Sequence, residues 1–322
     1  MQRGDCGAVY PLVGRRAMVV AIAAFADYHC IMSTIHTHAN LDAFLRNPGI
    51  ALKKGPVALI LLEDDVEVAS TILHHIDAGF KSIIVFGIAE IALPDLAAEN
   101  VHHVHFDATQ PGAVTTVVNA VIEKAPGLWL YYCYNAEYLL FPFCETRNIG
   151  ELLAFHTEER RDALLTYVVD LYAGDLNTHP HAVSIEDAHM DKSGYYALAR
   201  KDRDDNFKER QLDFFGGLRW RYEEHVPKNS RRIDRISVFR AKPGLRLRAD
   251  HTFNDDEYNT YACPWHHSLS VSLCSFRTAK ALKRNPVSAQ SIDTFMWYNS
   301  TPFRWHSQQL LDLGLMEPGQ WF

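Results

Sequence analysis

The chain has 322 residues, of which 48% are hydrophobic and 22% are charged, and its formal net charge is −7 at pH 7. That balance is typical of a soluble globular protein with a sizeable core, built as one large domain or two small ones. A general nucleic-acid-binding protein needs a basic face to neutralise phosphates, so the net charge argues against a nucleic-acid partner.

The six cysteines are scattered along the chain, with no C-x-x-C pair and no clustering of the kind that binds metal: Cys6, Cys30, Cys133, Cys144, Cys263 and Cys274. Such spacing predicts buried free thiols in a reducing compartment.

Near the N-terminus, Arg15-Arg16 precede an apolar run, AMVVAIAAFA, that resembles a weak signal-peptide core. Asp27 and His29 end the run early, and it is too short to span a bilayer. We therefore interpret it as a buried strand or helix and expect a cytoplasmic protein without a transmembrane segment. Met18 is an alternative start to Met1.

From residue 57 the sequence alternates between strand and helix patterns. Short apolar runs predict strands at 57–62, 82–87 and 101–106, with a helix before Gly79 and another at 113–124. This alternation predicts βαβ units and a parallel sheet. Neither a G-x-G-x-x-G nor a G-x-x-x-x-G-K-[ST] loop is present, so a bound nucleotide would be held by something other than a glycine cradle.

The stretch 128–143, LWLYYCYNAEYLLFPF, begins with six apolar or aromatic residues, which predicts a strand buried on both faces. Glu137 follows where that strand ends, and ligands of open α/β sheets bind at the carboxyl ends of strands. Glu137 is therefore a candidate site residue. The alternative is an acid that caps a turn beside the sheet.

The run 61–87, LLEDDVEVASTILHHIDAGFKSIIVFG, resembles the opening of the family-2-like glycosyltransferases, a branch of the GT-A fold. In that family a strand precedes an acidic pair, a helix ending in His-x-x-x-Gly, and a second strand. Glu63-Asp64 occupy the acidic pair here, with His75 and Gly79 at the His and Gly. The resemblance covers residues 57–142 and continues more loosely beyond them.

The family's next motif is Asp-x-Asp followed by Glu, where this chain reads WLYYCYNAEYL. The match resumes at Glu137, but Tyr134 and Ala136 replace both aspartates. In the GT-A fold those aspartates hold Mn²⁺ or Mg²⁺ against the diphosphate of a nucleotide sugar. The resemblance implies Glu137 and His251 as the remaining metal ligands. It leaves open a diphosphate stabilised by arginines alone, and a domain that has lost catalysis.

In the middle of the chain, SIEDAHMDKSGYYAL places Glu186, Asp187, His189 and Asp191 within six residues. Carboxylates and imidazoles at this density suit a metal site or a general base, and Asp187 is our first candidate for the base. The alternative is a solvated acidic loop.

The segment QLDFFGGLRWRYEEH carries Arg219 and Arg221 shortly after a glycine pair. The family has such a pair on the acceptor side of its cleft, and arginine forks suit diphosphate or carboxylate recognition. Asp213, which precedes the glycines, is the second candidate for the base that deprotonates an acceptor hydroxyl. The alternative is an edge strand with exposed, alternating arginines.

Beyond residue 258 we expect a turn and then a helix whose last turns are basic, with Arg277, Lys280, Lys283 and Arg284. The same residues could touch anionic lipid head groups, so a peripheral membrane contact stays open.

Together these features predict a single GT-A-like α/β domain, with a mainly parallel sheet flanked by helices and completed by a few antiparallel strands. We assign residues 1–56 to an N-terminal extension packed on the core, 57–258 to the glycosyltransferase-like domain, and 259–322 to a helical and aromatic C-terminal extension of it.

The resemblance implies sugar transfer from a nucleotide-sugar donor to a saccharide or other hydroxyl acceptor. Glu63 and Asp64 would contact the nucleoside end of the donor, and Arg219 and Arg221 would line the cleft. Two other classes stay open: a non-catalytic sugar- or nucleotide-binding descendant of the fold, and a metal-dependent hydrolase built on residues 186–191.

Overall fold

The structure, a computed structural model, describes residues 35–94, 100–262 and 267–321. The apolar run at 17–26, Met1, Met18, Cys6, Cys30 and Cys263 lie outside the described residues.

The described strands are β1 (His36–His38), β2 (Val57–Leu61), β3 (Ser82–Gly87), β4 (Val101–His105), β5 (Trp129–Tyr134), β6 (Glu137–Leu140), β7 (Ala163–Ala173), β8 (Ala188–Asp191), β9 (Tyr196–Lys201), β10 (Phe207–Phe215), β11 (Asp234–Arg240), β12 (Val271–Ser275) and β13 (Ser300–Pro302). The described α-helices are α2 (Leu41–Arg46), α3 (Val68–Asp77), α4 (Ala113–Lys124), α5 (Ile149–Glu158), α6 (Gly217–Arg221), α7 (Arg277–Arg284), α8 (Pro286–Ser291) and α9 (Ser307–Asp312).

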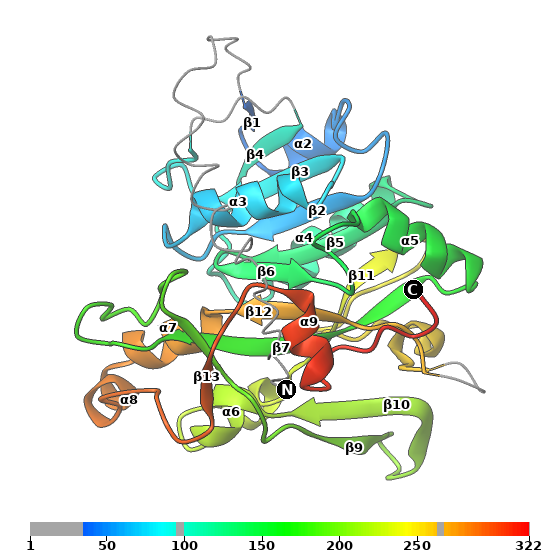
Figure 1. Ribbon diagram of the computed structural model, residues 1–322. Coiled ribbons are helices and arrows are strands. Elements are labelled where there is room, and N and C mark those ends of the chain that lie inside the picture. The colour runs from blue at the N-terminus through cyan, green and yellow to red at the C-terminus, as the bar shows by residue number, and fades with distance from the viewer. Residues whose placement is uncertain (1–34, 95–99, 263–266, 322) are drawn as a thin grey trace, which may run out of the picture.

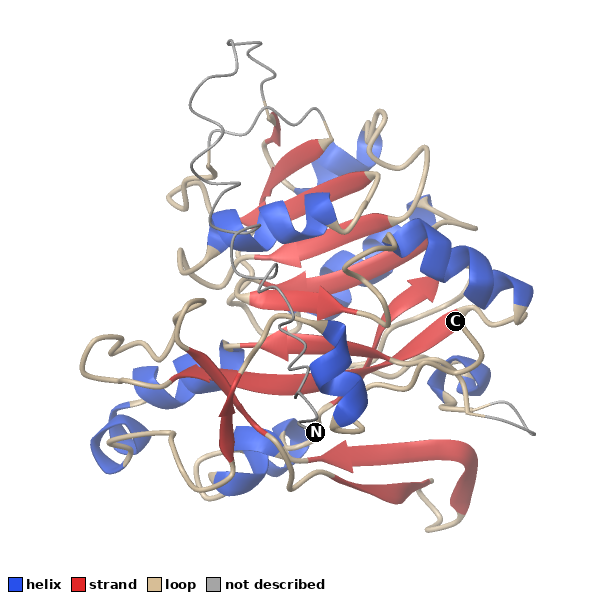
Figure 2. Cartoon of the chain, in the orientation of Figure 1, coloured by secondary structure: helices blue, strands red, loops and turns tan. Residues whose placement is uncertain are grey.

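One half of the main sheet is parallel, as the alternating sequence pattern predicts. Its strands lie in the order β1-β4-β3-β2-β5, and every neighbouring pair is parallel. Every residue of β2 and β3 is buried, because helices cover both faces of this half (Figures 1 and 2). Such double coverage is why these strands read as continuous apolar runs.

The two faces of the parallel half have separate cores. Leu59 of β2 packs with residues of α4 and with Phe44 of α2 on one face. Ile60 packs with Ile72 of α3 and Leu152 of α5 on the other. The alternation of side chains along a strand accounts for this division.

The second half of the main sheet is mixed. Strand β11 is antiparallel to both β5 and β7, β12 is parallel to β7, and β6 is antiparallel to β12. Strands β8 and β13 extend from the end of β7, and β9 and β10 form a separate two-stranded antiparallel sheet below β7 in Figure 1. The predicted α/β class, a mainly parallel sheet with some antiparallel strands, is confirmed at this level.

The C-terminal region departs from the expected turn and helix. The segment 271–275 forms β12, which lies inside the main sheet between β7 and β6. Its polar residues are serines, whose hydroxyls are satisfied internally: Ser272 Oγ donates to the carbonyl of Leu315. Small hydroxyl side chains tolerate burial when they are hydrogen-bonded, so the serines of this segment are compatible with a buried strand.

The structure also decides the conformation of the segment that carries Arg219 and Arg221, for which the sequence left an edge strand open. Residues 217–221 form the short helix α6, in which Arg219 is buried, so the alternative of an edge strand with exposed arginines is wrong. Within the described ranges no helix is long and apolar enough to cross a membrane.

The position of β12 predicts that the C-terminal segment is indispensable for folding. Replacing Leu273, which is 0% exposed at the centre of β12, by alanine should lower the free energy of unfolding by about 2–5 kcal/mol. Chemical denaturation measures the change. The matched control is Leu198→Ala, at a site 55% exposed on β9, which should stay within about 0.5 kcal/mol of the parent. Equal effects of the two substitutions would contradict this placement of β12.

Candidate functional site

Several polar residues meet at one edge of the main sheet, the edge at which β2, β5, β7 and β12 end. The pairing directions place the first residues of the antiparallel strands β11 and β6 at this same edge. We call this the carboxyl edge, and the following residues the carboxyl-edge cluster: Glu63, Asp64, Tyr134, Asn135, Glu137, Arg235, Ser275, Arg277 and Lys280.

A tight turn between β5 and β6 positions Glu137. Ala136 has φ of 59°, which turns the chain back so that Oε2 of Glu137 accepts a hydrogen bond from the backbone N–H of Tyr134 at 2.9 Å. Glu137 is also in register with Ser275 at the end of β12, whose Oγ donates to Oε1 at 2.9 Å.

The same carboxylate forms a bidentate ion pair with Arg235, the second residue of β11. Nη1 donates to Oε2 at 2.9 Å and Nη2 to Oε1 at 3.0 Å, and the two side chains are 2% and 0% exposed. Each oxygen of Glu137 therefore accepts two hydrogen bonds. A buried carboxylate is stable only when it is paired and bonded in this way.

Both partners of this pair are charged. Burial alone would raise the pKa of Glu137, but the charge and hydrogen bonds of Arg235 outweigh it and hold the pKa below its usual value. Burial would lower the pKa of Arg235, and Glu137 more than compensates for that effect.

A second bidentate pair, between Arg277 and Glu63, lies closer to solvent. Nε and Nη2 of Arg277 donate to the two oxygens of Glu63, each at 2.6 Å, and the side chains are 33% and 21% exposed. The guanidinium of Arg277 lies 3.8 Å from the centroid of the Tyr134 ring, and that of Arg235 lies 5.5 Å from it. The ring of Tyr134 is thus a platform for two guanidinium groups.

Helix α7 also neutralises Asp64. Nζ of Lys280 donates to both oxygens at 2.9 and 3.0 Å, and Arg284 donates to one of them at 2.8 Å. Burial would raise the pKa of Asp64, but Lys280 and the hydrogen bonds from Asn135 and Val66 lower it. Arg277 and Lys280, expected from the sequence in the last turns of a basic helix, therefore lie in its first half and pair with the acids that follow β2.

His251 lies close to the same edge but does not contact Glu137 directly. Its Nδ1 is 3.0 Å from the hydroxyl of Tyr132, and the two rings stack at 5.9 Å. Burial lowers the pKa of His251 well below its usual value, and the charges of Arg235, Arg277, Arg219 and Arg232 lower it further. The imidazole is therefore neutral and sits in the positive field of four guanidinium groups.

As arranged, Glu137 and His251 do not fit a divalent-metal site. His251 stacks on Tyr132, which packs on the α4 side of the sheet, whereas Glu137 shares its face of β6 with Leu139, on the α3 side. Among the described residues no group of three or more His, Cys, Asp or Glu side chains could hold a metal ion. A metal role would require Arg235 to leave Glu137, and it stays a prediction.

Asp213, a predicted general base, belongs to a network beside the start of β11. Its Oδ1 accepts hydrogen bonds from Nε of Arg200 and Nη1 of Arg232, both at 2.7 Å. Arg200 also donates to Asp234 at 2.6 Å. Asp213 is thus joined to the residues that immediately precede Arg235.

Arg219 reaches the vicinity of the carboxyl edge from α6. Its Nη1 donates to the carbonyl of Arg232 at 2.7 Å, and its Nε donates to Thr278, the neighbour of Arg277. The glycine pair makes this approach feasible: Gly217 has φ of 60°, and a Cβ there would lie 2.9 Å from Oδ2 of Asp170.

Arg221 and Asp187 lie elsewhere. Arg221 donates to the buried Asp191 at 3.0 Å and lies 4.4 Å from the Trp297 ring centroid. Asp187 accepts the backbone N–H of Asp175 at 3.0 Å, and its Oδ1 is 3.6 Å from Nδ1 of His189. Neither residue contacts the carboxyl-edge cluster.

Sequence reasoning predicted Glu63, Asp64 and Glu137 as site residues and missed the other six members of the cluster: Tyr134, Asn135, Arg235, Ser275, Arg277 and Lys280. One signal was available for Arg277: together with Lys280 and Arg284 it forms a helix face spaced at i, i+3 and i+7, suited to a nearby acidic pair. The partner of Glu137 is 98 residues distant in sequence, and no local pattern identifies it.

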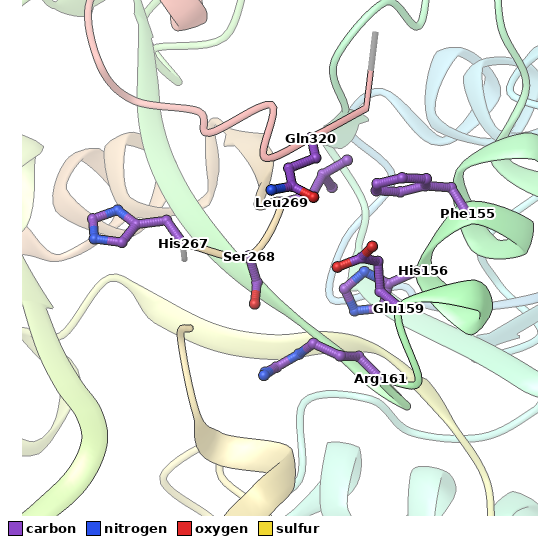
Figure 3. A pocket seen from close by; sticks show the side chains of 8 residues that line it. All are labelled: Phe155, His156, Glu159, Arg161, His267, Ser268, Leu269 and Gln320. Carbon is purple, nitrogen blue, oxygen red and sulfur yellow. The ribbon is translucent and has the colours of Figure 1, made fainter. Parts of the chain in front are cut away.

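A small pocket lies between the C-terminal end of α5 and the segments 267–269 and 320 (Figure 3). Phe155, His156 and Glu159 line one side, with Arg161 close by. Its volume is about 10 Å³, which is room for one water molecule and no more. It is therefore not a substrate site.

No known family model matches this sequence, and no curated protein matches it either.

The buried pair predicts a large effect of Glu137→Gln on stability. The substitution removes the charge and leaves Arg235 buried without a counter-ion, so the free energy of unfolding at pH 7 should fall by about 3–5 kcal/mol. Because the pKa of Glu137 is lower in the folded chain, its contribution is present above the unfolded value, 4.5, and is lost as the pH falls through the folded pKa.

Denaturation of parent and variant between pH 7 and pH 3 measures both effects. The difference between the two proteins should narrow as the pH falls below 4.5. A Glu137→Gln protein as stable as the parent at pH 7 would contradict the structural role of the pair.

Proposed function

We propose that this protein is a glycosyltransferase of GT-A-like architecture, which transfers a sugar from a nucleotide-sugar donor to a saccharide or other hydroxyl acceptor. One observation carries the proposal: the accessible Arg277–Glu63 pair lies over Tyr134 at the carboxyl edge, beside the buried Glu137–Arg235 pair. Open α/β sheets bind their ligands at this edge.

In the proposed site, arginines supply the positive charge that the family obtains from a metal. The diphosphate leaving group gains negative charge as the glycosidic bond breaks, and a guanidinium fork binds its oxygens bidentately. Arg277 can exchange the Glu63 carboxylate for the diphosphate, because both side chains are partly exposed. Arg235 is held by Glu137 and stays in place, so its charge contributes without moving.

Three other predicted residues keep their proposed roles: Glu63, Asp64 and Asp213. Glu63 and Asp64 would contact the nucleoside end of the donor. Asp213 would take the acceptor proton as the acceptor oxygen attacks the anomeric carbon and the nucleoside diphosphate leaves. Asp213 is favoured over Asp187 because Arg232 links it to the start of β11, whereas Asp187 contacts Asp175 and His189 and no member of the cluster.

The proposal includes a cytoplasmic location. Three cysteines lie in the described ranges, Cys133, Cys144 and Cys274, and all are free thiols. Free thiols are typical of a reducing compartment.

A second candidate function is a non-catalytic module that binds a sugar or nucleotide. The observation in its favour is that Glu63, Asp64 and Glu137 are all neutralised by cations of the chain itself. For the metal-dependent hydrolase, segment 186–191 brings together only Asp187 and His189, so no observation favours it.

Titration calorimetry with nucleoside diphosphates, in Mn²⁺ and in EDTA, tests the proposal. We expect binding of at least one nucleoside diphosphate, with similar affinity in the two buffers because arginines hold the phosphates. Affinity higher by on the order of tenfold or more in Mn²⁺ would contradict the metal-free site. Release of free nucleotide from a donor sugar would support the transferase, and tight binding without turnover would support the binding module.

Substitution of Arg277 tests the residue assignment. Arg277→Ala removes the guanidinium fork, so the affinity for the nucleoside diphosphate should fall by about 10- to 100-fold. The control is Arg246→Ala, since Arg246 also forms a partly exposed ion pair, at 2.6 Å with Glu123 of α4, on another part of the surface. An equal loss in the two variants, or none in Arg277→Ala, would refute the assignment.

A further inference from the structure

A cavity of about 230 Å³ lies between β7, the β9–β10 hairpin and the turn after α9. Its walls are aliphatic and aromatic, and none of its lining side chains carries a charge. The lining includes Tyr167, Tyr195, Tyr196, Ala197, Phe214 and Ile233. None of the residues assigned to the proposed reaction lines this cavity.

The cavity adjoins the segment that carries the arginines of the site. Ile233 lies between Arg232 and Asp234, two residues before Arg235. Phe214 follows Asp213 and donates its backbone N–H to Oδ1 of Asp234 at 2.8 Å. A molecule in the cavity would therefore lie beside the backbone of Asp213 and the start of β11.

The aromatic walls are held in fixed positions. Tyr167 and Phe214 meet edge to face with ring centroids 4.7 Å apart. The ring of Tyr195 packs against Gly216. A Cβ at residue 216 would lie 2.3 Å from that ring, so a side chain there would displace Tyr195. Tyr196 stacks on Phe215 at 5.2 Å and is 45% exposed, which places it at the mouth.

The size of the cavity suits one ring. An apolar cavity of about 150 Å³ is enough to bind benzene, so 230 Å³ accommodates a substituted aromatic ring. The only polar side-chain groups of the lining are tyrosine hydroxyls, and that of Tyr195 already donates to the carbonyl of Asp191 at 3.1 Å, so few partners are left for the several hydroxyls of a sugar ring. An aryl group gains edge-to-face and offset contacts with such walls.

We propose that this cavity is the acceptor subsite and that it takes an aryl ring attached to the acceptor. This inference rests on the proposed transferase function, because it assigns the acceptor of that same reaction. The aryl group anchors the acceptor, while the hydroxyl that is glycosylated lies outside the cavity, beyond Tyr196, which shares a face of the β9–β10 hairpin with Asp213.

Ligand-observed NMR and calorimetry with phenyl β-glucoside and methyl β-glucoside test the subsite, because the two probes differ only in the aryl group. The phenyl compound should bind and the methyl compound should not. Ala197→Trp should fill the cavity and weaken phenyl glucoside binding by about tenfold or more, since the ring loses its aromatic neighbours.

The matched control is Ala199→Trp, at an exposed position two residues further along β9 that does not line the cavity, and it should bind as the parent does. Equal binding of the two glucosides, or unchanged binding in Ala197→Trp, would overturn the subsite. Nucleoside diphosphate titrations of the same proteins separate the two claims. Loss of the aryl subsite with intact nucleotide binding refutes only this inference, and aryl binding without any nucleotide binding refutes the transferase but leaves an aryl site.

Discussion

The buried ion pair between Glu137 and Arg235 is the constraint on which the carboxyl edge depends. It joins the start of β6 to the start of β11, and through Ser275 it joins both to the end of β12. Three strands from distant parts of the chain are thereby fixed at one point. A buried charge without its partner is strongly unfavourable, so the ends of β6, β11 and β12 must stay together at this point in the folded chain.

Around this fixed pair the structure places charges that are less constrained. Arg277 is shared between Glu63 and the ring of Tyr134, and one third of its side chain is exposed. An accessible guanidinium in contact with a carboxylate can exchange that carboxylate for a phosphate at modest cost, since both provide the same bidentate oxygens. In the proposed site, the rigid Glu137–Arg235 pair provides position, and Arg277 of the exposed pair provides the binding group.

Much of the parallel half of the fold could be predicted from the sequence, and the mixed half could not. Strands buried on both faces, such as β2 and β3, read as uninterrupted apolar runs, so their pattern has one interpretation. Strand β12 is equally buried but contains serines, and its burial depends on partners such as the carbonyl of Leu315. The cost of burying Glu137 indicated a partner or a function, but the identity of Arg235 follows only from tertiary pairing. Arg221 was predicted as a site residue and is not one of the cluster. It follows the glycine pair in sequence, but its guanidinium pairs with Asp191, away from the carboxyl edge.

The central claim is that arginines at the carboxyl edge bind the diphosphate of a nucleotide donor. A crystal structure of the protein with a bound nucleoside diphosphate tests it most directly. The account predicts phosphate oxygens within hydrogen-bonding distance of the Arg277 guanidinium, with the Glu137–Arg235 pair intact. A nucleotide bound elsewhere, or phosphates held by a metal on Glu137 after Arg235 has moved away, would contradict it.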